Sequence, residues 1–167
     1  MTSVLMIFLS GVVGGTSSSY VYDGDGKRAS RTVGGVTTRF VYDSGAGLPV
    51  LLTDGSRKYV WGLGLAYATD LAGAVQAVYH TDGLGSVRAV TDGSGQLVQT
   101  ERTDEFGVVQ ARLGSDGQAV SGGQPFGYTG EQRDGETGLV YLRARMYDPQ
   151  IGRFVQRDPF PGGIGSP

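Results

Sequence analysis

The sequence predicts an all-β fold built from antiparallel hairpins, and three observations support this prediction. Seven Asp-Gly pairs punctuate the chain after residue 20, at residues 23–24, 25–26, 54–55, 82–83, 92–93, 116–117 and 134–135. Asp-Gly favours a type I′ turn, which joins two neighbouring strands through two residues. The segments between the pairs are rich in Val, Thr, Tyr and Phe. No stretch of about ten residues carries a helical stripe of apolar side chains.

Residues 1–19 differ from the rest of the chain and are expected to be an apolar leader or a stray strand. Val4–Val13 is apolar, but it is about half as long as the roughly 20 residues that span a bilayer. The start of the chain carries no basic residue and no small-residue cleavage site follows it, so it does not match a signal peptide. We therefore expect no membrane span.

A tyrosine-aspartate unit recurs between residues 20 and 78, where we expect a series of hairpins. Its first copy reads Y-x-Y-D-x-x-G-x-R and comprises Tyr20, Tyr22, Asp23, Gly26 and Arg28. The second copy begins twenty residues later and comprises Phe40, Tyr42 and Asp43. A period of 20–50 residues indicates a repeat architecture, in which each unit buries its apolar face against its neighbours.

Two segments show the two-residue period of half-buried strands. In Val36–Asp43, one face carries Val36, Thr38, Phe40 and Tyr42. Leu139–Tyr147 predicts one continuous strand, whose buried face carries Val140, Leu142, Ala144 and Met146. On this register Arg143 and Arg145 lie on the opposite face.

The Y-x-Y-D-x-x-G-x-R unit resembles the YD repeat of Rhs proteins, bacterial Tc toxin components and teneurins. Tyr79–Asp92 (YHTDGLGSVRAVTD) and Phe126–Pro159 (FGYTGEQRDGETGLVYLRARMYDPQIGRFVQRDP) are similar to the Rhs repeat-associated core. The resemblance divides the chain into repeat hairpins at 20–78, a core at 79–160 and a flexible tail at 161–167. Two positions depart from the family pattern, since Thr103 replaces the usual Tyr and Gln156-Arg157 replaces a small or Ser-containing pair.

The resemblance implies a core motif at Asp82, Gly83, Gly85, Arg88, Gly130, Gly138, Leu139, Tyr141, Arg145, Tyr147, Asp148, Pro149, Gly152, Arg153, Phe154, Asp158 and Pro159. It also implies that the hairpins form part of a curled β-shell, which encloses a C-terminal domain, often a toxin. By the same resemblance, we expect the core to close one end of such a shell and the protein to be secreted or at the cell surface.

The expected partners are a longer Rhs/YD-repeat shell or a second copy of the chain, bound through unpaired sheet edges. Tyr20–Asp23 is the first such edge, and Val4–Val13 is expected to cover it in part.

Aromatic residues at equivalent strand positions are expected to stack as ladders that hold a hollow wall together. They are Tyr20, Tyr22, Phe40, Tyr42, Tyr59 and Trp61. Two alternatives stay open, namely ordinary half-buried strand aromatics and a solvent-facing stripe that binds sugars.

Asp148 and Asp158 are the candidate catalytic residues, because two neighbouring aspartates can share a proton and activate water. In many family members the core is an aspartyl-type autoprotease. Both aspartates precede proline, however, and Asp before Pro also caps turns. Self-cleaving relatives continue into Asp-Pro-x-Gly-Leu, whereas this sequence continues as FPGGIGSP. We therefore expect a non-enzymatic structural fragment. The alternatives are a truncated autoprotease core and an extracellular strand-adding interaction module.

The composition excludes several classes of site. The chain has no cysteine and His80 is its one histidine, so disulfides, thiolate catalysis and Cys/His zinc sites are excluded, and no cofactor is expected. The 14 basic and 16 acidic residues nearly balance, which argues against nucleic-acid binding. Asp23–Gly26 resembles the start of a calcium loop, but Lys27 occupies the third ligand position.

Overall fold

The computed structural model describes residues 7–13, 16–45 and 47–157, and for residues 7–13 it describes the backbone alone. In these ranges all regular elements are antiparallel strands except one short 3₁₀ turn, which confirms the predicted all-β fold. The strands form three sheets, and within each sheet neighbouring strands follow one another in the chain. No helix in this part of the chain has the length and apolar character needed to cross a membrane.

The first sheet consists of β1 (Ile7–Val13), β2 (Thr16–Tyr22), β3 (Arg28–Val33) and β4 (Val36–Arg39). β1 pairs with β2 along its whole length, with Leu9 opposite Tyr20. Most of the apolar run is therefore a strand of the sheet. The expectation that Val4–Val13 covers the edge at Tyr20–Asp23 is thus confirmed for Ile7–Val13, and the outer edge of this sheet lies at β1.

The second sheet is a meander of β5 (Val41–Asp43), β6 (Val50–Thr53), β7 (Arg57–Trp61), β8 (Leu65–Asp70), β9 (Val75–Thr81), β10 (Val87–Thr91), β11 (Leu97–Thr103) and β12 (Val109–Gly114). Only Phe40 separates β4 from β5, so one interrupted strand links the first two sheets. The predicted alternation holds at Thr38, Phe40 and Tyr42, which are half-buried, whereas Val36 is exposed. β9 runs across residues 78 and 79, so repeat hairpins and core share one sheet.

The third sheet consists of β13 (Gln132–Arg133), β14 (Val140–Leu142), β15 (Arg145–Asp148) and β16 (Arg153–Phe154), preceded by the 3₁₀ turn η1 (Tyr128–Gly130). The continuous strand predicted for Leu139–Tyr147 is wrong, because the chain reverses between β14 and β15. Arg143 has a φ of 57°, which lies in the left-handed region and ends the strand. Consequently Tyr141 is buried beside Val140, and Ala144 is exposed.

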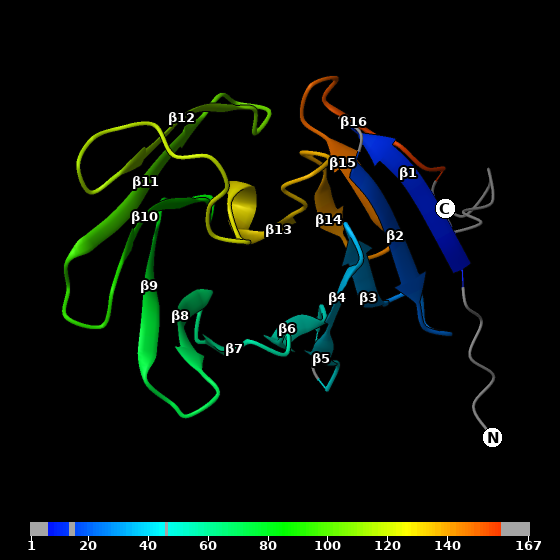
Figure 1. The fold of residues 1–167 in the computed structure, drawn as a ribbon, viewed down its shortest axis with the longest axis horizontal. Coiled ribbons are helices and arrows are strands. Elements are labelled where there is room, and N and C mark those ends of the chain that lie inside the picture. The colour runs from blue at the N-terminus through cyan, green and yellow to red at the C-terminus, as the bar shows by residue number, and fades with distance from the viewer. Residues whose placement is uncertain (1–6, 14–15, 46, 158–167) are drawn as a thin grey trace, which may run out of the picture.

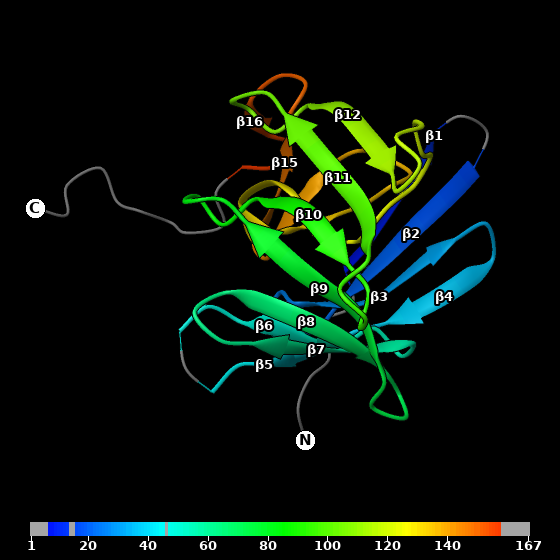
Figure 2. The same cartoon turned by 90° about the vertical axis from the view of Figure 1, so that its left-hand side faces the viewer.

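The sheets form an open curl with the C-terminal segment (residues 124–157) folded into it. Figure 1 shows the second sheet curving from β12 round to β5 and the first sheet continuing the curve to β1, with η1 and β13 inside. Figure 2 shows the same wall from the side of β9–β12. Each of the two buried apolar clusters combines wall residues with the C-terminal segment, through Phe126 in one and through Tyr141 and Met146 in the other.

A recurring hairpin turn differs from the predicted type I′ turn. Its aspartate is followed three residues later by a glycine with positive φ, and it occurs at Asp23, Asp70, Asp82, Asp92 and Asp104. In the turn at Asp82, the Oδ1 atom accepts the N–H groups of Leu84 and Ser86 at 2.9 and 3.0 Å. This is a type I turn followed by a left-handed residue. The glycine that the turn requires is therefore Gly85, with a φ of 82°, and not Gly83.

Gly85→Ala is expected to lower the free energy of unfolding by about 1–2 kcal/mol, because a side chain strains a left-handed backbone. Gly83→Ala is the matched control, since φ there is not positive and an added Cβ meets nothing within 4 Å. We expect its effect to stay within about 0.5 kcal/mol. Urea denaturation measures both, and equal losses would contradict this turn geometry.

Candidate functional site

A buried ion pair joins the first repeat unit to the C-terminal segment. Arg28, the last residue of the unit and the first of β3, is 1% exposed. Its Nη1 donates to Oδ1 and Oδ2 of Asp134 at 2.7 and 2.6 Å, and Asp134 is 0% exposed. The two residues are 106 positions apart in the chain. The pair therefore holds β3 against the turn between β13 and β14.

Aromatic rings surround the Arg28 guanidinium. Its Cζ lies 4.4 Å from the ring centroid of Tyr141, 4.8 Å from that of Phe40 and 5.7 Å from that of Tyr20. The faces of such rings attract a cation. The backbone N–H of Arg28 also donates to the Tyr141 hydroxyl at 2.8 Å. Burying a charge is costly unless it is paired, and here a carboxylate and three rings offset that cost.

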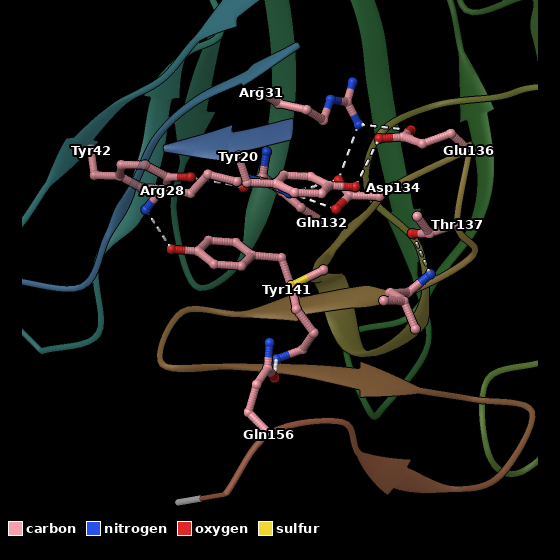
Figure 3. A network of polar contacts seen from close by, with 12 residues as sticks. Tyr20, Arg28, Arg31, Tyr42, Gln132, Asp134, Glu136, Thr137, Tyr141 and Gln156 are labelled. Carbon is pink, nitrogen blue, oxygen red and sulfur yellow. Dashed lines mark hydrogen bonds and ion pairs between the residues drawn. The ribbon is translucent and has the colours of Figure 1, made fainter. Parts of the chain in front are cut away.

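Asp134 also accepts a second guanidinium. Nη1 of Arg31 lies 3.0 Å from Oδ1 of Asp134 and 3.4 Å from Oε2 of Glu136. The Tyr20 hydroxyl donates to Oε1 of Glu136 at 3.1 Å. Figure 3 shows this network, which we call the junction cluster: Tyr20, Arg28, Arg31, Tyr42, Gln132, Asp134, Glu136 and Tyr141. It connects residues of β2, β3 and β5 to β13, β14 and the turn between them.

Burial keeps the hydroxyls of Tyr20, in the junction cluster, and of Tyr22, which packs on Tyr141, in their neutral form. It raises the pKa of Tyr22 to about 12. Burial is also the largest cause of the raised pKa of Tyr20, and the negative charge of Asp134 adds to it. For Arg28, burial alone would lower the pKa, but the charge of Asp134 outweighs it and the pKa is raised. The junction thus holds a stable cation and neutral hydroxyls, and these tyrosines are not activated nucleophiles.

The aromatic residues of the middle repeats pack on Phe126, which comes from the C-terminal segment. Its ring centroid lies 5.1 Å from Tyr59, 5.6 Å from Trp61 and 6.2 Å from Tyr79. All three contacts are edge-on, which is a favoured geometry for aromatic pairs. Sequence reasoning did not single out Phe126.

Tyr141 has the same role at the other end of the wall. Its ring centroid lies 6.5 Å from Tyr22 and 6.4 Å from Tyr42. The predicted ladders are wrong, since Phe40 and Tyr42 form the one ring pair found within the predicted set. The repeat aromatics lie on strands separated by another strand, a spacing of about 10 Å that their rings do not bridge. The six rings are buried or half-buried, so they form no solvent-facing stripe.

A second buried charge cluster, centred on Glu101, was not predicted from the sequence. Glu101 on β11 is 6% exposed and accepts Arg112 at 2.7 and 2.9 Å and Arg133 at 2.9 Å. Glu131 pairs with Arg143. The sequence carries no apolar alternation that marks this face, because the two buried residues of β11, Gln99 and Glu101, are both polar.

The first half of the predicted core motif comes together around the turn at Asp82. Nε of Arg88 donates to Oδ2 of Asp82 at 2.7 Å, and its Nη1 donates to Oγ1 of Thr103 at 3.0 Å. Thr103, which departs from the family pattern, therefore accepts a hydrogen bond from a motif residue. Gly130 packs closely against this turn, because an added Cβ would lie 3.0 Å from the carbonyl oxygen of Gly85.

The second half of the motif lies in the β13–β16 hairpins. Cζ of Arg145 lies 3.6 Å from the ring centroid of Phe154, and the Tyr147 ring contacts the same ring at 6.0 Å. Pro149 is buried, whereas Arg153 is exposed. Leu139 packs beside the buried cluster of Tyr141. Two glycines with positive φ occupy turns, Gly138 at 74° and Gly152 at 64°.

Asp148 lies at the end of β15, where its Oδ1 accepts the N–H of Gln150 at 2.8 Å. This contact is the turn-capping role that Asp before Pro favours. Asp158 and Pro159 lie outside the described residues, so catalysis by an aspartate pair stays a prediction. Within the ranges described, no group of three or more His, Asp or Glu residues is placed to hold a metal ion.

Asp134→Asn is expected to lower the free energy of unfolding by about 3–5 kcal/mol, because it leaves Arg28 buried without a carboxylate. Asp116→Asn is the matched control at an exposed turn, where Oδ1 accepts the N–H of Gln118 at 3.0 Å. Combining Asp134→Asn with Arg28→Met should recover at least half of the loss, because the unpaired cation is gone. Denaturation followed by circular dichroism measures these effects. Equal losses from Asp134→Asn and Asp116→Asn would contradict the role of the pair.

Stability is expected to fall as the pH rises from about 10 to about 12. Tyrosine ionises near pH 10 in an unfolded chain, whereas burial raises the pKa of Tyr22 to about 12. Below pH 10 the tyrosine is neutral in both states and its contribution to the stability of the fold is fully present. Above pH 10 the tyrosine loses its proton first in the unfolded chain, which is therefore favoured. Tyr22→Phe should make the decline shallower in alkaline denaturation. A free energy of unfolding that stays constant over this range would count against the burial of these hydroxyls.

Comparisons with known proteins agree with this geometry. The double-stranded DNA deaminase toxin A of Burkholderia cenocepacia is 36% identical over 81 residues, which cover 48% of this chain and 6% of the relative. The solved structure of TcdB2-TccC3-Cdc42 superposes with a TM-score of 0.64 over 92% of this chain and 8% of that chain. At 21% identity this similarity shows the fold alone, and it confirms the expected shell-like architecture.

The sequence similarity extends over most of the chain. The tRNA(Glu)-specific nuclease WapA of Bacillus subtilis subsp. natto is 35% identical over 153 residues, which cover 89% of this chain and 6% of the relative. This chain therefore spans only a small part of the length of such relatives. The family model described as teneurin YD-shell matches residues 13–161. The resemblance carried by the tyrosine-aspartate repeats is thus confirmed, and the chain belongs to the teneurin YD-shell family.

Proposed function

We propose that this chain is a non-enzymatic structural segment of a YD shell, of the kind that encloses a C-terminal toxin or effector. The observation that carries the proposal is the Arg28–Asp134 pair, which ties the first repeat to a segment 106 residues further on. A curved wall of short hairpins needs such cross-connections, because it has no filled interior of its own. Phe126 and Tyr141 supply two more of them.

The relatives named as a nuclease and a deaminase toxin share with this chain only 6% of their length. We assign the shared part to the shell and not to the activities in those names. Supporting this assignment, the junction tyrosines are held neutral by burial and Asp148 caps a turn. Asp134 and Glu101 both form buried ion pairs with arginines of this chain, as structural carboxylates do.

The proposed partners are a longer YD-repeat shell or a second copy of the chain. β1 and β4 are the outer strands of the first sheet, and β1 has a single paired neighbour, β2. A free strand edge presents unpaired N–H and C=O groups and accepts another strand. We further propose a secreted or cell-surface location, as the resemblance to toxin shells implies.

The first test of the proposal is that the chain does not cleave itself. Purified protein incubated from about pH 4, where carboxylates are about half ionised, to about pH 8, where they are fully ionised, should keep its intact mass. Asp148→Asn serves as the comparison, since an Asn side chain still caps the turn. A discrete pair of fragments that forms in the original protein and is missing from the variant would instead establish the autoprotease alternative.

The second test concerns the β1 edge. Successive N–H groups of a strand point to opposite sides, so of Ser10 and Gly11 one faces β2 and the other faces outward. Of the two variants Ser10→Pro and Gly11→Pro, one should keep the fold and lose self-association, because proline removes an outward donor. Sedimentation velocity over a range of concentrations measures this. A monomer at every concentration, unchanged in both variants, would exclude association through β1.

A further inference from the structure

A cavity of about 650 Å³ lies beside the junction cluster, between β3 and β4, the turn from β6 to β7, and the start of the C-terminal segment. Its wall carries one acidic residue, Asp54, among the described residues that line it. Five arginines share that wall: Arg28, Arg31, Arg39, Arg57 and Arg133. The cavity therefore concentrates guanidinium groups in a chain whose overall charge is −2.

Not all of these charges are neutralised by protein carboxylates. Asp134 and Glu136 pair with Arg28 and Arg31, as described above. The guanidinium of Arg57 donates to the neutral Gln124 side chain at 2.7 Å, and it forms no ion pair with a described residue. Oδ2 of Asp54 accepts the Tyr59 hydroxyl at 2.6 Å instead.

Arg39 and Arg133 add to this surplus. The Arg39 side chain forms no hydrogen bond or ion pair with any residue in the described ranges. Arg133 shares the single carboxylate of Glu101 with Arg112. Arg39 and Arg57 carry one positive charge each and Arg133 about half of one, while Asp54 offsets one, so between one and two positive charges at the cavity lack a protein counterion.

Three arginines of this wall also have buried nitrogen atoms without a protein acceptor, and these atoms are closed off from solvent. The Arg133 side chain is 7% exposed, yet its Nε and Nη2 donate to no acceptor in the protein. The same holds for the Nε atoms of Arg28 and Arg31. A buried donor without an acceptor costs about 1–3 kcal/mol and more when it is charged, so native proteins seldom keep several of them together.

We infer that this cavity binds an anionic ligand that carries two oxyanion groups. A guanidinium group bonds carboxylates and phosphates in the same forked geometry, so either chemistry satisfies the arginines. The volume falls in the range of small-molecule sites. Val36, Phe40 and Pro125 on the wall offer apolar contact for the carbon skeleton of such a ligand.

Binding there would stabilise the fold, because the ligand contacts both the wall and the C-terminal segment. This inference does not depend on the proposed function, since an arginine-lined cavity would bind anions in any shell. It is also compatible with the charge balance of the whole chain, which argued only against nucleic-acid binding.

Isothermal titration calorimetry on the full chain tests the inference with two probes. Pyrophosphate represents the phosphate source, and the dipeptide N-acetyl-Glu-Glu-amide represents the carboxylate source. We expect at least one of them to bind with one-to-one stoichiometry and a dissociation constant below about 1 mM at low salt. The probe that binds more tightly identifies the source of the oxyanions.

Arg39→Gln is the decisive variant, because Arg39 is exposed and contributes no side-chain bond to the fold. It should weaken binding about tenfold, and the double variant with Arg57→Gln should weaken it further. Arg102→Gln is the matched control, since Arg102 is an exposed strand arginine outside the cavity wall. Circular dichroism verifies that each variant is folded. Failure of both probes to bind, or an equal loss in Arg102→Gln, would overturn the inference.

Discussion

The structure depends on a buried cation that the first repeat unit supplies and a distant turn neutralises. Arg28 is stable within its aromatic surroundings only because Asp134 lies beside it, since an unpaired charge there would cost several kcal/mol. The pair therefore fixes the position of the turn between β13 and β14 against β3. Arg31 and Tyr20 bond to the same turn, so the first sheet and the C-terminal segment are held by charge as well as by apolar contact.

The same constraint explains how a curved wall of short strands is stable. Repeat aromatics on alternate strands are too far apart to stack, so the wall cannot be held by its own rings. Phe126 and Tyr141 bridge that spacing, and each contacts rings from different wall strands or loops. Each end of the wall is therefore expected to unfold together with the part of the C-terminal segment that it contacts.

Much of the fold follows from local pattern, because alternation and turn aspartates are local signals. The position of the turn glycine does not follow from the Asp-Gly pattern. The Asp82 carboxylate accepts hydrogen bonds from later N–H groups, and this favours a type I turn that ends at Gly85. The reversal of the chain at Arg143 could not be predicted, because the alternation of apolar residues in the sequence continues through the two-residue turn between β14 and β15. Of the site, Arg28 was identified through its repeat unit, whereas Asp134 was interpreted as a turn residue and as one of several acids that balance nearby arginines, and its pairing with Arg28 was not predicted. No local pattern encodes a contact between residues 106 positions apart.

Hydrogen exchange of the Asp134→Asn variant, followed by mass spectrometry, tests the central claim most directly. The claim predicts that amides of β2 and β3 lose protection together with those of β14 and β15, because one ion pair holds both. Amides of β9–β11, where Tyr79 packs on Phe126 and Glu101 accepts Arg112, should exchange as in the original protein. Loss of protection confined to β13–β15, with β2 and β3 unchanged, would contradict the claim.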